Sequence, residues 1–183
     1  MNDTEALAEL LQRRSIRHGD FTLASGAKSS YYIDCRPSTM SGEGQALIGR
    51  MGLAAIRAQR WAPSSVGGLT MGADPVAYAI ARASVESAPA IDAFSVRKQA
   101  KEHGTGKRVE GNFTAGHEVV VIEDVITSGG SALQAIEAIR AEGGIVLGVL
   151  AVVDREQGGR EKLEAAGHAV TTLITTTTLG LKR

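Results

Sequence analysis

The sequence is poor in cysteine, in excess charge of either sign and in long apolar runs. Cys35 is the only cysteine among 183 residues, which excludes an intrachain disulfide and a multi-cysteine metal site. Twenty basic residues balance twenty acidic ones, so no net charge draws the chain toward nucleic acid or a membrane surface. No stretch approaches the ~18 apolar residues of a membrane span, and the N-terminus does not read as a secretion signal. We therefore expect a cytoplasmic location, with neither nucleic acid nor membrane as a partner.

The remaining composition is that of a globular protein, with 43% hydrophobic and 22% charged residues. A chain of this length can bury the core of one domain. We expect a single domain over residues 1–183, in which residues 1–62 include N-terminal cap elements and residues 63–175 form the core sheet.

Strand-like and helix-like segments alternate over about residues 65–175, which indicates an α/β fold with a parallel sheet covered by helices. The uninterrupted apolar run VLGVLAVV favours a strand that is buried on both faces. The expected strands are residues 65–69, 91–96, 119–124, 146–154 and 169–175, and the expected helices are residues 75–84, 131–143 and 159–167.

The N-terminal third departs from this rhythm and predicts a smaller cap. A first helix capped by Asp3 or Thr4 would place its leucines on one face. Residues 21–34 alternate around a Ser-Gly-Ala-Lys turn, which predicts a hairpin or two short strands. A second helix is expected over about residues 43–60.

Residues 127–131 read Thr-Ser-Gly-Gly-Ser, between a predicted strand and a predicted helix. Ligands of open parallel sheets bind beyond the carboxyl ends of the strands. Backbone N–H groups of such a turn, together with its hydroxyls, can hold one phosphate. The stretch matches neither the Walker P-loop nor the G-x-G-x-x-G dinucleotide pattern, so a nucleoside triphosphatase is not expected.

Glu123 and Asp124 stand immediately before this turn. A carboxylate beside a phosphate raises the energy of both unless a polar or cationic group lies between them. The vicinal hydroxyls of a sugar can donate to the carboxylates while its phosphate sits in the turn, and a metal ion on those hydroxyls would strengthen the arrangement. The predicted ligand is a 5-phosphorylated ribose.

Two other loops carry cations at the same predicted sheet edge. Residues 95–111 hold five basic and two acidic residues, a local charge of +3 in a neutral chain, between glycines that can act as hinges. A long polar loop of this kind is typical of a functional lid, and its His103 can exchange a proton near pH 7. Arg155 follows another strand, where its guanidinium can pair with a carboxylate or carbonyl edge.

The segment VVVIEDVITSGGS, residues 119–131, resembles the hallmark of the type I phosphoribosyltransferases. Three further segments are similar to the orotate-using branch of that family: FTLASGAKSSYYID (21–34), RKQAKEHGTGKRVEG (97–111) and VVDREQGG (152–159). The resemblance covers about residues 5–175. It implies a type I phosphoribosyltransferase fold, with a central, mainly parallel sheet flanked by helices and a small N-terminal hood.

The resemblance also implies a reaction. Ribose 5-phosphate would pass from 5-phosphoribosyl 1-diphosphate (PRPP) to orotate, giving orotidine 5′-phosphate and diphosphate, in de novo pyrimidine (UMP) biosynthesis. Mg²⁺ would be carried by the substrate diphosphate and ribose hydroxyls, with no direct protein ligand. Members of the family are usually homodimers whose basic loop closes over the neighbouring subunit's site.

The same resemblance implies roles for individual residues. The implied catalytic residues are Lys101, His103 and Asp124, the first two acting in trans. The implied PRPP-binding residues are Arg97, Lys98, Lys101, His103, Glu123, Asp124, Val125, Ile126, Thr127, Ser128, Gly129, Gly130 and Ser131. The implied orotate-binding residues are Lys28, Thr127 and Arg155.

The chain departs from the family's pattern at Thr70-Met71-Gly72, where many bacterial members carry Tyr-Lys-Gly. A lysine that would contact the diphosphate is missing, so backbone amides or another residue must make that contact. Asp74 is a candidate for holding metal-bound water.

Two alternatives stay open at this point. The first is a phosphoribosyltransferase for a purine or another pyrimidine. Arg155 and Lys28 argue against this alternative, because two cations suit an anionic base. The second is a regulatory binding protein that kept the phosphoribosyl site and lost turnover. The presence of Lys101 and His103 argues against this alternative and favours an enzyme.

Removing the Lys101 charge tests the lid. As diphosphate leaves, negative charge develops on it, and a preorganised cation stabilises that charge. We expect Lys101→Ala to lower kcat by ~10²-fold or more, measured by steady-state assay. Unchanged turnover would remove Lys101 from the chemistry.

Overall fold

The computed structural model describes residues 2–22, 26, 28–99 and 107–181. Within these residues a six-stranded sheet has the order β5-β4-β3-β6-β7-β8. All neighbouring strands are parallel except β4 and β5, which are antiparallel. The strands are β3 Ser65–Leu69, β4 Asp92–Val96, β5 Val109–Gly111, β6 Glu118–Ile126, β7 Ile145–Asp154 and β8 Val170–Thr175.

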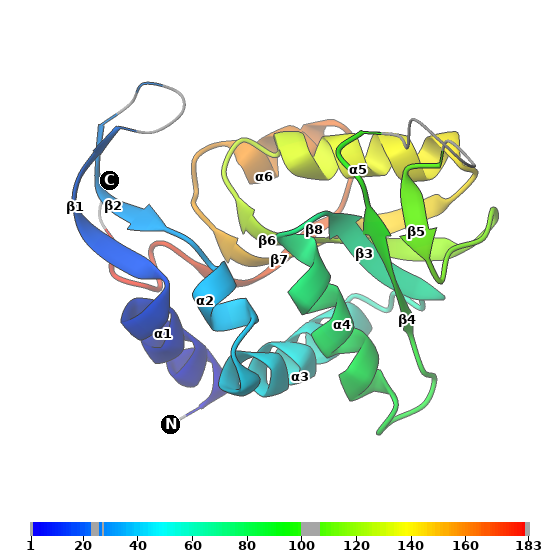
Figure 1. The fold of residues 1–183 in the computed structure, drawn as a ribbon, viewed down its shortest axis with the longest axis horizontal. Coiled ribbons are helices and arrows are strands. Elements are labelled where there is room, and N and C mark those ends of the chain that lie inside the picture. The colour runs from blue at the N-terminus through cyan, green and yellow to red at the C-terminus, as the bar shows by residue number, and fades with distance from the viewer. Residues whose placement is uncertain (1, 23–25, 27, 100–106, 182–183) are drawn as a thin grey trace.

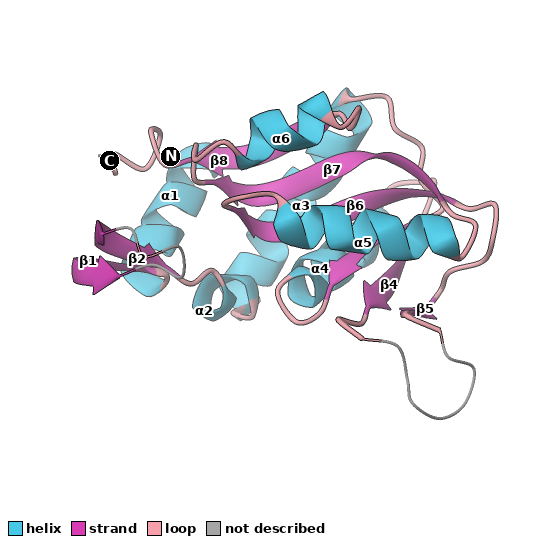
Figure 2. Cartoon of the chain, turned by 90° about the horizontal axis from the view of Figure 1, so that it is seen from above, coloured by secondary structure: helices cyan, strands magenta, loops and turns pink. Residues whose placement is uncertain are grey.

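Helices cover both faces of this sheet (Figures 1 and 2). Residues of β6 alternate between two cores because successive side chains of a strand point to opposite faces. Val120 and Ile122 pack on one face, and Val119 and Val121 pack on the other. The helices of the first face are α1 Asp3–Arg14, α3 Gly42–Ala58 and α4 Ala73–Ser84, and those of the second are α5 Gly130–Ala141 and α6 Gly159–Ala165.

A small N-terminal hood stands beside the sheet, at the left of Figure 1. Its hairpin joins β1 Ile16–Thr22 and β2 Lys28–Ile33 in antiparallel register. The short helix α2, Arg36–Thr39, leads from the hairpin to α3. Helix α1 packs under the hood, with Leu7, Leu10 and Leu11 fully buried.

The predicted α/β class and mainly parallel sheet are confirmed, as are the hairpin and the leucine face of the first helix. The predicted cap of that helix was wrong. Asn2 caps it, because its side chain accepts the Glu5 N–H while the Glu5 carboxylate accepts the Asn2 N–H at 2.9 Å. The short elements α2 and β5 were not predicted.

Strand β6 also runs further than predicted. Pairing with β7 continues through Val125↔Val153 and Ile126↔Asp154, so the two acids lie inside the strand rather than at its end. Helix α5 likewise begins at Gly130, one residue before the predicted start. The backbone positions of Glu123 and Asp124 are therefore fixed by the pairing of β6 with β7. Among the described residues, no helix is long and apolar enough to cross a membrane.

Leu150 tests how far the central strand supports the fold. It is fully buried in β7, so Leu150→Ala removes apolar contacts and leaves a cavity. We expect a loss of about 2–5 kcal/mol in the free energy of unfolding, measured by denaturant titration. Ile145→Ala, at a 51% exposed position of the same strand, is the control and should cost less than about 1 kcal/mol.

Candidate functional site

Two cavities open at the carboxyl ends of the parallel strands. The hood cavity, about 800 Å³, lies between the hairpin and the ends of β6 and β7, and is lined by Phe21, Tyr32 and Arg155 among others. The loop cavity, about 490 Å³, lies against the Leu69–Gly72 segment and is lined also by Lys98. Asp124 and Arg36 line both. One extended ligand can therefore reach from one cavity into the other.

The turn between β6 and α5 offers unoccupied N–H donors. Gly129 caps α5 with a left-handed φ of 73°, and no side chain caps the helix. Thr127 and Ser128 line the hood cavity, while Ser131 lines the loop cavity. A helix N-terminus with free N–H groups and a favourable dipole suits an anion such as phosphate.

A second glycine turn holds this one in place. A Cβ on Gly129 would lie 2.8 Å from the Gly159 carbonyl oxygen, and one on Gly159 would collide with the Thr127 carbonyl oxygen. The Arg155 N–H also donates to the Ile126 carbonyl at 3.0 Å. The Gly158-Gly159 pair thus supports the anion turn, a role that the sequence signalled only by two glycines after a strand.

The paired acids are buried beside the turn. Glu123 is 7% exposed, and its Oε1 has no hydrogen-bond partner among the described residues. Burial, and secondly the Asp124 charge, raises the pKa of Glu123 to about 8. Burial also raises the pKa of Asp124, whose Oδ1 accepts the Val125 N–H at 2.9 Å. A buried acceptor without a donor fits a ligand that brings hydroxyl groups.

Arg155 is buried in the opposite wall. It is 6% exposed, and its Nε and Nη2 find no hydrogen-bond partner in the described part of the chain. Its guanidinium lies 5.4 Å from the centroid of the buried Tyr31 ring. An unpaired buried guanidinium is costly, so this geometry fits an anionic ligand in the hood cavity.

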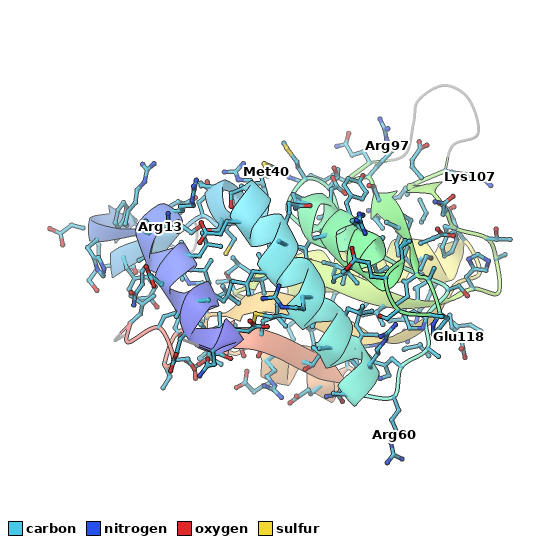
Figure 3. The ribbon with its side chains drawn as sticks, turned by 90° about the horizontal axis from the view of Figure 1, so that it is seen from below. Arg13, Met40, Arg60, Arg97, Lys107 and Glu118 are labelled. Carbon is cyan, nitrogen blue, oxygen red and sulfur yellow. The ribbon has the colours of Figure 1, made fainter. Side chains whose placement is uncertain are left out.

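The other predicted residues are placed unequally. Lys98 lines the loop cavity, and Arg97 Nη1 lies 3.7 Å from Glu110 Oε1 at the molecular edge labelled in Figure 3. Val125 lines the hood cavity, whereas the Ile126 side chain is buried in the core, so that only its backbone can serve a ligand. Gly130 opens α5 at an exposed position.

Among the charged residues predicted for the site, Arg97, Lys28, Lys101 and His103 are not brought into either cavity by the described structure. Lys28 is exposed on the hairpin, donates to Thr22 Oγ1 at 2.8 Å and lines neither cavity. Lys101 and His103 lie outside the described residues. Their roles stay predictions.

The Thr70–Gly72 loop closes one side of the loop cavity. Its Met71 is 57% exposed, and the Thr70–Met71 peptide bond is cis. A Cβ on Gly72 would lie 2.7 Å from Asp124 Oδ1, so only glycine lets the loop approach that carboxylate so closely. Asp74 accepts the Thr70 hydroxyl at 2.6 Å and lines neither cavity, so its predicted role toward metal-bound water stays a prediction.

Sequence reasoning missed the pair Asp34–Arg36. Arg36 donates from Nε and Nη2 to the two Asp34 oxygens, at 2.8 Å each. The pair follows the hairpin, where nothing in the sequence suggested that the chain returns to Asp124. Across residues 2–22, 26, 28–99 and 107–181, no three His, Cys, Asp or Glu side chains are grouped to hold a metal ion.

An anion turn, buried acids and a buried guanidinium around one extended cavity are the parts of a phosphoribosyl-transfer site. The phosphoribosyl transferase domain model matches residues 45–172, and the chain belongs to this family. Its relatives narrow the membership to the orotate phosphoribosyltransferases. That of Mycobacterium avium (strain 104) is 46% identical over 179 residues, covering 98% of this chain and 97% of the relative.

Further comparisons agree. The orotate phosphoribosyltransferase of Rhodopirellula baltica is 43% identical over 184 residues, covering 98% of this chain and 95% of the relative. The Mycobacterium tuberculosis H37Rv enzyme superposes with a TM-score of 0.88 at 45% identity in a complex with Fe(III) dicitrate, covering 98% of this chain and 100% of that one. Its complex with PRPP superposes with a TM-score of 0.84 at 42% identity and the same coverage.

The raised pKa of Glu123 predicts a dependence of stability on pH. Between its ordinary value near 4.5 and about 8, the folded protein keeps a proton that the unfolded chain releases. Raising the pH therefore favours unfolding. We expect wild type to lose roughly 3 kcal/mol relative to Glu123→Gln between pH 5 and pH 8, measured by urea unfolding.

Glu118→Gln, at an exposed position of the same strand, is the matched control and should follow wild type across this pH range. Parallel pH profiles for wild type and Glu123→Gln would contradict the buried, protonated Glu123.

Proposed function

We propose that the chain transfers ribose 5-phosphate from PRPP to orotate, giving orotidine 5′-phosphate and diphosphate, as a step of de novo pyrimidine (UMP) biosynthesis. The observation that carries this proposal is the buried, unpaired Arg155 guanidinium in a cavity shared with Thr127 and Asp124. An anionic base satisfies that guanidinium next to a site suited to a phosphorylated sugar. The curated relatives named for this activity support the same reaction.

PRPP would extend across the place where the hood cavity and the loop cavity adjoin. Its 5-phosphate takes the N–H groups of Thr127 to Ser131, and Ile126 contributes through its backbone alone. Its ribose hydroxyls donate to Glu123 and Asp124, which supplies the donor that buried Glu123 Oε1 lacks. Its diphosphate extends into the loop cavity toward Lys98, with Arg97, Lys101 and His103 acting from the basic loop.

Orotate would occupy the hood cavity. Its carboxylate or a ring carbonyl pairs with Arg155, and Thr127 contacts the ring from the anion turn. Lys28 belongs to the same hood, and the proposal places it near the base when substrates are bound. Asp124 lies between the base and the diphosphate, beside C1 of the ribose, the carbon that exchanges the diphosphate for the base.

Charge separation defines what each side chain does. When diphosphate leaves with the bonding electrons, C1 of the ribose becomes positive and the leaving group negative. The basic side chains stabilise the leaving anion, and the Asp124 carboxylate provides a favourable field for the cationic sugar. Exclusion of water by the hood and basic loop protects the reactive sugar from hydrolysis.

Mg²⁺ fits this arrangement as an ion carried by the substrate. The Asp124 carboxylate lines both cavities, and Glu123 Oε1 has no protein donor in the described residues, so both acids can accept from the ribose hydroxyls. The diphosphate and ribose hydroxyls would hold the ion without a direct protein ligand. When bound, it neutralises part of the diphosphate charge.

We extend the proposal to the assembly and its organisation. Residues 1–183 act as a single domain, with cap elements within residues 1–62 and a core sheet over residues 63–175. The unit is a homodimer in which the basic loop, with Lys101 and His103, serves the neighbouring subunit's site. The cytoplasmic location stays a prediction of the sequence.

Orotate depletion tests the activity. Purified protein at catalytic concentration should consume orotate only with PRPP and Mg²⁺, and should leave adenine, xanthine and uracil unchanged. Consumption of a neutral base instead would identify a different phosphoribosyltransferase. PRPP binding without turnover of any base would identify a regulatory protein.

Arg155→Gln tests base recognition. Loss of a charge-assisted bidentate contact should lower kcat/KM for orotate by about 10²-fold, with a much smaller change in the KM for PRPP. The free energy of unfolding of the unliganded protein should not fall, because the variant removes an unpaired buried charge.

Arg160→Gln is the control, because it removes a half-buried arginine that is paired with Glu164 on α6 at 2.9 Å and lines neither cavity. Its kinetics should match wild type. An Arg155→Gln enzyme with unaltered orotate kinetics would exclude the guanidinium from base binding.

A further inference from the structure

Arg36 occupies a position that neither the sequence nor the proposed reaction assigns. Among the described residues, only Arg36 and Asp124 line both the hood cavity and the loop cavity. Arg36 is the first residue of α2, so it approaches the sheet edge from the hood rather than from the strand ends. It therefore stands where a ligand would pass from one cavity into the other.

The charges around the loop cavity call for a cation at this place. The Asp124 carboxyl group lines it, and a diphosphate brought there adds further negative charge. Like charges at such short range raise the energy of the bound state unless cations offset them. In the described lining these cations are Lys98 and Arg36, since Met71 offers no charge from the 69–72 loop.

The geometry of Arg36 leaves it ready to bind an anion. Asp34 accepts from Nε and Nη2, at 2.8 Å each, which fixes the plane of the guanidinium. Nη1 makes no hydrogen bond within the part of the chain that the structure describes. The Arg36 side chain keeps 50% of its exposure despite the ion pair. One edge of the fork is thus anchored, and the remaining nitrogen can donate to a ligand.

We propose that Arg36 binds the diphosphate of the phosphoribosyl donor through Nη1, where the donor crosses from the loop cavity into the hood cavity. This inference rests on the proposed function, because that function places a diphosphate in the loop cavity. Arg36 supplies from the hood the cationic contact that Met71 cannot supply from the 69–72 loop. It stabilises the negative charge that the diphosphate gains as it leaves C1.

Asp34 is a positioning residue in this arrangement. It touches the Arg36 guanidinium on the edge away from Nη1, so it orients the fork without meeting the donor. The net charge of the Asp34–Arg36 pair is close to zero. Nη1 can still donate a hydrogen bond, and Asp34 fixes the plane of the guanidinium that carries it. Orientation of the donor, more than net charge, is what Asp34 contributes.

Magnesium diphosphate binding to the intact protein provides the test, measured by calorimetric titration of wild type, Arg36→Gln and Arg36→Lys. We expect the Kd for magnesium diphosphate to rise about tenfold in Arg36→Gln and by a smaller factor in Arg36→Lys. The KM for PRPP should rise with it, while the KM for orotate should change little.

Arg50→Gln is the matched control. Arg50 forms the same two-bonded pair, from Nε and Nη2 to Asp3 at 3.0 and 2.8 Å, but lines neither the hood cavity nor the loop cavity. Its diphosphate affinity and kinetics should equal those of wild type. If Arg36→Gln does not fold, Arg36→Lys alone decides the matter, because it keeps the charge and loses the fork.

Wild-type diphosphate affinity in Arg36→Gln, or in Arg36→Lys where only that variant folds, would overturn the proposal. A raised KM for orotate with unchanged diphosphate affinity would also overturn it, by assigning Arg36 to the base. If the proposed function is wrong, wild type will not consume orotate. That result is distinct from a failure of the Arg36 proposal. The diphosphate titration would still report on Arg36 in that case.

A double-mutant cycle separates positioning from mere packing. If Asp34 acts through Arg36, Asp34→Asn should raise the diphosphate Kd in wild type and add nothing in the Arg36→Gln background. Additive effects of the two substitutions would reject the positioning role of Asp34.

Discussion

Unpaired buried polar atoms at one edge of the sheet are the constraint on which this molecule depends. Glu123 Oε1 and two nitrogens of Arg155 lie buried with no partner among the described residues. Each costs free energy in the empty protein, and each is the kind of atom that a sugar hydroxyl or an anionic base can satisfy. The sheet holds them because Glu123 and Arg155 are attached to strands packed on both faces, with Val120, Val121, Leu150 and Ala151 fully buried nearby. The fold thus holds buried polar atoms in fixed positions where a bound ligand can pair with them.

The path from strand register to chemistry is short. Pairing of β6 with β7 through Ile126↔Asp154 carries two acids to the end of a rigid strand and releases the chain into a left-handed glycine. The next loop brings its own glycine against that turn, so neither turn can accept a side chain without moving the other. Gly72 instead lies against a side chain, because a Cβ there would be 2.7 Å from the Asp124 carboxylate. The shape of the two turns therefore depends on close backbone contacts, which leave little room for local adjustment.

Sequence alone could predict the elements with strong periodicity and the motif with a physical reason. The parallel strands of the sheet, the anion turn and the paired acids were readable, because apolar runs and small-residue turns are local signals, whereas the short antiparallel β5 was not. Arg155 was readable from its place after a strand, but its burial and lack of partners were not, since both depend on packing. Asp34 and Arg36 could not be found, because their approach to Asp124 depends on how the hairpin and α2 fold back over the sheet. The cap at Asn2 was missed for a smaller reason, as three consecutive residues could each accept a helix N–H.

The hood has a consequence for how specificity can change. The family model matches residues 45–172, whereas Phe21, Tyr32 and Arg36, which line the hood cavity, precede that range. The proposed phosphate turn and the paired acids therefore belong to the part of the chain that the family model matches, and much of the wall of the hood cavity belongs to residues before it. The two parts meet at Asp124 and Arg36, which line both cavities. Such modularity lets a lineage exchange its acceptor by rebuilding one hairpin while the donor half is inherited intact.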